Sequence, residues 1–499
     1  MDTKDLSSMK QLPQKITPLT AIAILCLVAN LLLLACPVLG QTISGYSSSV
    51  PSAPGVTTGA SGSLGQNPFT GSVPQGKATS EILPLSFKDA IDLGLRNNLG
   101  LLLQSDNTIA ARGAKWKELS ELLPNLTTAT SENAAQTNLA AQGLRLPGFP
   151  KVIGPYGFFD TRVYLTQSLF SLKALNRERG ASDSEKAAQY TYKDARDLVV
   201  LAVGNAYLQA LAGGARVETT QAQVQTAQAL YDKSVDQQSA GVSPAIDTLR
   251  AKVEFQTRQQ QLIVARNDYA KQKLALARAI GLPPGQEFTL SDKAPYEPLA
   301  ALGLEQSLER AYASRSDYQA AQHQVRAAEH FRKAATAEYF PSLDAGGNYG
   351  DIGATPGNSH GTFQVAATLR IPIFQGGKVH GDVLQAEATM RQNRQQLENL
   401  RGQIDYDVRT ALLDLAAAAD QVEVARSSVD LADQTLIQAR DRFAAGVTDN
   451  LEVVQAQETV AAANENYISS LYAHNLAKVA LARAIGYAEE GVKQYLKSK

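Results

Sequence analysis

The sequence contains very little cysteine. Of its 499 residues only Cys26 and Cys36 are cysteines, and both lie in an apolar stretch near the N-terminus. A chain that loses this stretch has no disulfide and no cysteine-based metal site. The five histidines are scattered without a close ligand spacing, and we interpret them as surface or packing residues. We therefore expect no metal and no cofactor.

The sequence also lacks a net charge of either sign. Lysine and arginine total 47, aspartate and glutamate total 48, and the formal net charge is −1. Strong binding of nucleic acid through a basic surface is therefore not expected. No Ser/His/Asp set, metal cluster or phosphate-binding loop is arranged for chemistry, so we do not expect an enzyme.

Long apolar runs are missing except for one near the N-terminus. Three lysines precede an apolar run over residues 19–39, which is the layout of a secretory signal peptide. We assign residues 1–40 to this signal, with cleavage before Gln41. The segment Leu33–Cys36 also resembles a lipoprotein box, so lipidation of Cys36 is the alternative. In both cases the protein is exported.

The strongest pattern in the sequence is a heptad repeat near the C-terminal end. Apolar or small residues follow one another at steps of four and three at Ile404, Val408, Ala411, Leu415, Ala418, Val422, Ala425, Val429, Ala432, Leu436, Ala439 and Phe443. A strict seven-residue period is typical of a coiled-coil seam, and a row of alanines lets helix axes approach closely. The pattern predicts long helices packed side by side.

The chain is predicted to be an internal duplication. Residues 203–234 show the same alternation, and LALARAIG at 274–281 returns almost unchanged as VALARAIG at 479–486. The predicted organisation is a signal over 1–40, a flexible Ser/Gly/Pro-rich leader over 41–80, a first repeat over 81–281, a linker over 282–298, a second repeat over 299–486 and a tail over 487–499.

Each repeat is predicted to contain a helix, a β-hairpin, a long helix and a shorter helix. The predicted helices cover 86–123, 172–240 and 244–280 in the first repeat, and 304–340, 378–445 and 451–485 in the second. At 1.5 Å per residue, each long helix would span about 100 Å.

The predicted strands carry one apolar and one polar face. Alternation is clear over 160–170 and 362–371, and the first strand of each hairpin is placed at 126–138 and 343–351. Strands near ten residues long with this pattern suit a transmembrane β-barrel. The alternative is a soluble hairpin at the tip of a coiled coil, although a lone hairpin is only marginally stable in water.

Four strands are too few to close a membrane barrel, and open strand edges are not tolerated in lipid. The chain must therefore pool its strands with copies of itself. Two copies would give eight strands and a filled interior, whereas three would give twelve strands and an open conduit. The predicted fold is mainly α with a small β part. Duplicated long antiparallel coiled-coil helices form an α-barrel, and four transmembrane β-strands per chain contribute to a trimeric twelve-stranded β-barrel.

Several features together resemble the TolC-like outer-membrane efflux proteins. They are the duplicated layout, the Ala-Gly-Val turns at 240–242 and 445–447, the segment LEVVQAQ at 451–457 and the two ALARAIG endings. The resemblance covers about residues 85–486. It implies a homotrimer in outer-membrane lipid with a helical tunnel in the periplasm. It also implies a periplasmic adaptor (membrane fusion) protein and an inner-membrane transporter as partners in the export of small molecules or secreted proteins.

The resemblance further implies an entrance constriction. In the family, acidic residues six positions past each turn glycine narrow the periplasmic end of the pore, and here these are Asp247 and Glu452. Rings of negative charge at a constriction attract cations. The alternative is that both are solvated residues near helix N-termini, which favour anions. Gln455 and Thr448 replace an acidic and a basic residue of the family's latching ion-pair network, so gating by that network is not implied.

The two helical turns match the positions where adaptor proteins dock in the family. They consist of Gly241, Val242 and Ser243 in the first repeat and Gly446, Val447 and Thr448 in the second. Helix termination alone would also explain their glycines. The alternative function for the whole chain is a soluble periplasmic coiled-coil scaffold or adaptor.

Overall fold

The computed structural model describes residues 68–491, with short gaps at 142, 144–146, 149, 293–295, 297, 300–302, 449 and 490. The predicted signal peptide, Cys36 and most of the leader lie outside the described residues. All elements discussed below belong to one compact unit, Gly65–Lys499.

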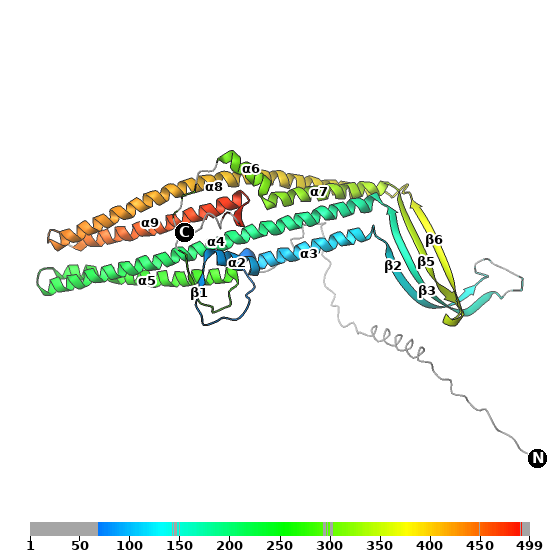
Figure 1. Ribbon diagram of the computed structural model, residues 1–499, viewed down its shortest axis with the longest axis horizontal. Coiled ribbons are helices and arrows are strands. Elements are labelled where there is room, and N and C mark those ends of the chain that lie inside the picture. Colours follow the sequence, from blue (N-terminus) through cyan, green and yellow to red (C-terminus); the bar gives the residue numbers. More distant parts are fainter. Residues whose placement is uncertain are drawn as a thin grey trace, which may run out of the picture. The chain divides into compact units, whose positions relative to one another are not determined.

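Each repeat has two consecutive helices before its hairpin and a long and a shorter helix after it (Figure 1). In the first repeat these are α2 (Phe87–Asn97), α3 (Leu99–Ser120), α4 (Leu172–Ser239) and α5 (Ala245–Ile280). In the second they are α6 (Leu304–Ser314), α7 (Ser316–Thr336), α8 (Lys378–Ala444) and α9 (Asn450–Ala484). The predicted long and shorter helices are confirmed to within one or two residues.

The opening helix of each repeat is broken, so the prediction of one continuous helix was wrong. Asn98 is extended between α2 and α3, and its side chain accepts a hydrogen bond from the Leu101 N–H at 3.3 Å. Arg315 is extended in the same way between α6 and α7. Neither break contains proline or glycine, so the sequence offered no strong breaking signal there. The predicted cap of α2 is confirmed, because Ser86 accepts from the Asp89 N–H.

The heptad seam is confirmed as the buried face of α8. Ten of its twelve predicted positions are buried, and the other two, Leu415 and Val429, are half-buried. Helix α8 packs against α9, and α4 packs against α5 in the same way (Figure 1). The alanine row therefore brings two antiparallel helices together in each repeat.

Helix α4 contains an apolar window long enough to cross a membrane by length and composition alone. Half of this window is buried within the helical part. Because α4 also packs against α2, α3, α5, α7 and α9, we interpret it as a central core helix.

The four long strands form one antiparallel sheet. They are β2 (Asn125–Asn138), β3 (Val152–Phe170), β5 (Ser342–Gly353) and β6 (Ser359–Arg370), in the order β2-β3-β5-β6. The two predicted hairpins are confirmed, and β3 pairs with β5 to join them. The strands are longer than predicted at their distal ends, so the hairpin loops are correspondingly shorter.

The two faces of this sheet differ sharply in polarity. Register aligns Val163 with Tyr349 and Tyr349 with Phe363, which places apolar side chains on one face. Phe363 and Val365 on this face are 77% and 80% exposed in the single chain. On the alternate positions Asn348, Gln364 and Thr368 line a hollow of 590 Å³. The alternation predicted from sequence is therefore present.

A second, short sheet was not predicted. Strand β1 (Leu83–Leu85) pairs in parallel with β4 (Phe288–Leu290), and Leu85 and Phe288 are both buried. Strand β4 lies in the segment expected to be only a linker. Three residues per strand are too few for a periodic signal, so the sequence could not reveal this pair.

The end of the predicted flexible leader is held against the helices, which corrects that expectation for residues 68–80. The Leu99 N–H donates to the Gly71 carbonyl at 3.0 Å, and the Val73 N–H donates to the Asn97 carbonyl at 2.8 Å. Phe69 packs against the core formed by α2, α4 and α5. The physical reason is that the break at Asn98 leaves backbone groups that this segment satisfies.

Candidate functional site

The two helical turns have the same geometry. Gly241 and Gly446 both have φ +71°, the left-handed conformation that glycine adopts without a Cβ penalty. The Val242 N–H donates to the Gln237 carbonyl at 2.9 Å, and the Val447 N–H donates to the Arg442 carbonyl at 3.0 Å. These are the bonds of a Schellman motif. Val242 and Val447 are 77% and 69% exposed beyond them.

The two acidic residues near these turns lie in different surroundings. Asp247 is only 4% exposed, and its carboxylate accepts a hydrogen bond from the Ser243 hydroxyl at 2.9 Å. Glu452 is half-buried, and its Oε1 lies 3.0 Å from Nη1 of Arg442. The sequence placed both at equivalent positions, but only Glu452 presents its carboxylate partly to solvent in the single chain.

Asn450 joins the starts of the two shorter helices. It is fully buried, and its Nδ2 donates to the backbone carbonyl of Asp247 at 2.6 Å. The sequence analysis did not identify this residue. Its first-repeat counterpart, Ala245, has no polar side chain, so repeat symmetry gave no signal for it.

The two ALARAIG endings contact the breaks between α2 and α3 and between α6 and α7. Gly281 and Gly486 both end a helix with positive φ, +77° and +71°. A Cβ on Gly281 would lie 2.5 Å from the Cβ of Asn97, and a Cβ on Gly486 would lie 2.7 Å from the Arg315 nitrogen. Each glycine therefore allows a helix end to touch the break of its own repeat. We call these contacts the first joint and the second joint.

Side-chain hydrogen bonds support each joint. At the first joint Asn97 Nδ2 donates to the Ile280 carbonyl at 3.0 Å. At the second joint the Ser314 hydroxyl donates to the Ile485 carbonyl at 3.1 Å. The sequence analysis recognised the repeated motif but did not predict what it contacts.

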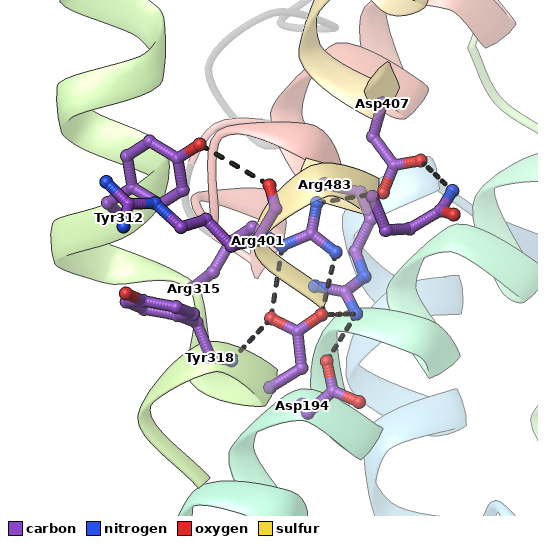
Figure 2. Close-up of polar contacts among 9 residues, drawn as sticks. Asp194, Tyr312, Arg315, Tyr318, Arg401, Asp407 and Arg483 are labelled. Carbon is purple, nitrogen blue, oxygen red and sulfur yellow. Dashed lines mark hydrogen bonds and ion pairs between the residues drawn. The ribbon is translucent and has the colours of Figure 1, made fainter. Parts of the chain in front are cut away.

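The second joint also carries a cluster of charges (Figure 2). Arg315 binds Asp317 at 2.7 Å and Asp407 of α8 at 3.0 Å. Arg483 of α9 binds Asp194 of α4 and lies 3.8 Å from Asp317. The cluster therefore connects α4, α7, α8 and α9 around the almost fully buried Arg315 side chain.

The protonation properties of this cluster follow from its burial. Burial raises the pKa of Asp194 despite the charge of Arg483. Burial likewise raises the pKa of Asp197, one turn along α4, to about 6. At Asp317 burial is outweighed by the hydrogen bond and charge of Arg315, and the pKa is lowered. Burial therefore raises the pKa of Asp194 in the cluster and of Asp197 beside it, whereas Arg315 lowers the pKa of Asp317.

The histidines do not gather into a metal site among the residues that the structure describes. His323 Nδ1 lies 3.0 Å from a carboxylate oxygen of Asp183, and His330 Nε2 lies 3.7 Å from the other oxygen. His474 is buried beside Tyr296, and burial lowers its pKa to about 4. These three histidines lie within the helical part, whereas His360 lies in β6 and is exposed, as is His380 in α8.

With this geometry established, comparison with known proteins decides the family. A family model described as "Outer membrane efflux protein" matches residues 120–282 and 307–487, one segment in each repeat. The chain belongs to the outer membrane efflux protein family. The resemblance noted in the sequence is thereby confirmed.

Relatives of this family are distant in sequence but similar over most of their length. The alkaline protease secretion protein AprF of Pseudomonas aeruginosa is 23% identical over 406 residues, covering 77% of this chain and 82% of AprF. The outer membrane protein TolC of Vibrio cholerae is 22% identical, covering 83% of this chain and 94% of TolC.

Solved structures show the same fold. A membrane protein from Pseudomonas aeruginosa superimposes with a TM-score of 0.70 at 20% identity, covering 84% of this chain and 97% of that one. The outer membrane protein VceC of Vibrio cholerae gives a TM-score of 0.68 at 19% identity, covering 80% and 96%. The predicted fold class, helices with a smaller β part, is confirmed.

The function and location of the chain follow from its membership in the outer membrane efflux protein family. The chain is an outer-membrane channel protein of efflux or secretion systems. The alternative of a soluble periplasmic scaffold is therefore wrong. The family is one of transport proteins.

Proposed function

We propose that three copies of the chain form one conduit across the outer membrane and the periplasm. Twelve strands would close the barrel, and the helices would form a tunnel below it. The observation that carries this proposal is the four-stranded sheet with two open edges. In the order β2-β3-β5-β6, strands β2 and β6 each have a partner on one side only.

The polarity of the sheet supports the same assembly. Unpaired backbone groups cannot remain in lipid, so β6 of one copy should pair with β2 of the next. The exposed face with Phe363 and Val365 would then contact lipid, and the polar face would line the water-filled interior. Eight strands from two copies would leave an interior filled by side chains.

The mass of the protein extracted from outer membranes in detergent tests this proposal. Native mass spectrometry should give three mature chains, and heating should release single chains. Cysteines placed along β6 should crosslink to cysteines in β2 of another copy, whereas cysteines in the inner strand β3 should not. A mass of one or two chains would contradict the proposal.

We also propose that a periplasmic adaptor docks at the two turns and connects the channel to an inner-membrane transporter. The docking surface consists of Gly241, Val242 and Ser243 together with Gly446, Val447 and Thr448. Its support is the matching geometry of the turns and the exposure of both valines. The conduit would export small molecules or secreted proteins, and the chain itself would catalyse no reaction.

A charge placed on the docking surface tests this part of the proposal. Changing Val242→Asp and Val447→Asp together should abolish export in cells, because a buried apolar contact would meet an unpaired carboxylate. The double variant must still show the mass and channel conductance of the wild-type assembly. Normal export by the variant would contradict docking at these turns.

Asp247 and Glu452 are proposed to narrow the entrance and to favour cations. What supports this is their place in the first turn of α5 and α9, directly after the two turns. Because Asp247 is buried and Glu452 is partly exposed, neutralising Glu452 should change cation selectivity more than neutralising Asp247.

A further inference from the structure

A groove of 630 Å³ lies between α4, α7 and α8, close to the sheet. Two lysines at its rim, Lys173 and Lys378, lie in the first turns of α4 and α8, the long helices that follow β3 and β6 in the chain. Its floor is α7. This volume is within the range of small-molecule pockets, about 300–1,000 Å³.

The floor of the groove is apolar. Phe331 is 39% exposed there, and it is flanked along α7 by Ala327, Ala328, Ala334 and Ala335. Gly180 of α4 leaves space for the ring, since a Cβ on this glycine would lie 2.8 Å from it. The aromatic ring is thus held in place with part of its surface free to contact an apolar molecule.

One cationic side chain of the groove has no acidic partner. Glu338 pairs with Lys173 at 2.8 Å and with Lys378 at 3.4 Å, and Asp382 lies 3.5 Å from Lys378. Arg177 also lines the groove, is half-buried, and has no hydrogen bond or ion pair with any described residue. Three cationic and two acidic side chains therefore give the groove a net positive charge.

Because Arg177 has no ion-pair partner among the described residues, its guanidinium is available to bind an anion through charge-assisted hydrogen bonds. The apolar floor favours a ligand larger than a simple inorganic anion, because such an ion would leave the free surface of Phe331 in contact with water. A molecule with a carboxylate at one end and an apolar body satisfies both features.

The groove continues the polar face of the sheet. Arg370 lines both the hollow on that face and a second hollow of 440 Å³ at the junction with the helices. Lys173, Glu338 and Lys378 line this second hollow and the groove. The three depressions therefore adjoin one another, and the first of them lies on the face that would line the interior of the proposed barrel.

We propose that this groove binds an amphiphilic organic carboxylate, with the carboxylate on Arg177 and the apolar body on Phe331 and the alanines of α7. The binding itself follows from the residues of one chain. Only its placement inside the conduit, as a contact site for exported organic anions, rests on the proposed function.

Binding of 2-naphthoate to the extracted, assembled protein tests the proposal. Saturation-transfer NMR should show saturable binding of 2-naphthoate and much weaker binding of the uncharged 2-naphthamide. Arg177→Gln should weaken naphthoate binding about tenfold or more, because a charge-assisted contact is lost. Arg179→Gln is the matched control, since Arg179 is exposed on the same helix and does not line the groove.

A second variant separates the two halves of the site. Phe331→Ala should weaken naphthoate and naphthamide alike, because it removes the apolar floor and leaves the charge. The proposal is overturned by equal naphthoate affinity in wild type and Arg177→Gln, by naphthamide binding as tightly as naphthoate, or by no saturable binding in the assembled protein. Native mass and conductance, measured on the same samples, report separately on the proposed trimer.

Discussion

The first and second joints share one steric device and differ in their chemistry. In both, a glycine with positive φ lets the end of a helix touch a break between two consecutive helices. At the first joint the break is covered by the neutral amide of Asn97. At the second, Arg315 sits at the break and is surrounded by Asp317, Asp407 and the neighbouring Arg483.

The two kinds of contact act over different ranges: the glycine contact lies within one repeat, whereas the ion pairs connect the two repeats. The glycine contact is internal to its own repeat in both cases. The charges of the second joint extend further, because Arg483 in the second repeat binds Asp194 of α4 in the first. Close steric fit therefore forms the joint, and the ion pairs tie it to the other half of the chain.

Among the substitutions at the two joints, removal of Arg315 should cause the largest loss of stability. Arg315→Gln should destabilise the protein by about 3–5 kcal/mol, because it leaves Asp407 without its cation and Asp317 with only the more distant Arg483. The thermal unfolding midpoint in detergent measures the loss. At the first joint, Asn98→Ala removes a helix cap and the hydrogen bond from Asn98 Nδ2 to the Phe69 carbonyl, and should cost about 2 kcal/mol.

A second change shows whether charge is the cause. The double variant Arg315→Gln with Asp317→Asn should recover part of the lost stability, since it removes one of the uncompensated carboxylates. If the double variant is no more stable than Arg315→Gln alone, the loss comes from packing and the charged joint has no electrostatic role.

Substitution of a joint glycine should cause the second-largest loss of stability. Gly486→Ala should cost about 2–4 kcal/mol, because the added Cβ meets the Arg315 backbone as well as adopting an unfavourable φ. Gly446→Ala is a matched control with the same φ of +71° and open space around it, and it should cost about 1–2 kcal/mol. Equal losses in the two variants would show that the close approach at the joint does not matter.

A smaller change in stability should come from the titration of Asp197, which lies near the charged cluster of the second joint. Burial raises the pKa of Asp197 to about 6, so between its usual pKa and about pH 6 the folded chain binds more protons at this carboxyl than the unfolded chain. The stabilisation from this proton is present at low pH and is lost as pH rises through about 6. Asp197→Asn should therefore gain about 1–3 kcal/mol relative to wild type at pH 7.5, and little at pH 4. A gain that is the same at both pH values would exclude this titration.

The two entrance carboxylates should show the smallest changes in stability and a clear difference in conduction. Glu452→Gln should lower the cation preference of the channel, while stability changes by about 0.5 kcal/mol or less because the ion pair with Arg442 is exposed. Asp247→Asn should cost about 1 kcal/mol, since it removes the negative charge that accepts the Ser243 hydroxyl and lies 3.7 Å from Nη1 of Arg250, and should change selectivity less. Planar-bilayer recordings compare them, and equal loss of selectivity would show that Asp247 also faces the pore.

Much of the fold was predictable because its signals are long and periodic. The seam of α8 repeats over forty residues, and the turns at Gly241 and Gly446 end their helices with the residue best suited to positive φ. Alternation over β3 and β6 placed both hairpins. In each case many residues support the same assignment, so a residue that departs from the pattern at one position does not change it.

The candidate site was less predictable because its contacts join distant parts of the chain. Arg315 is a good helix former, yet α6 ends at this residue, where Gly486 brings another helix against its backbone. Asn450 gives a hydrogen bond to a backbone carbonyl that no sequence pattern marks. The different burial of Asp247 and Glu452 is likewise a property of packing, since their sequence positions are equivalent.

The self-contained nature of each joint has a consequence for the history of the chain. A chain of half the length would already contain its own break, its own glycine contact, its own hairpin and its own pair of antiparallel helices. Six such chains would supply the same strands as three full-length chains. Fusion of two copies would leave each joint free to change independently of the other, and the two joints now differ in the charges around Arg315.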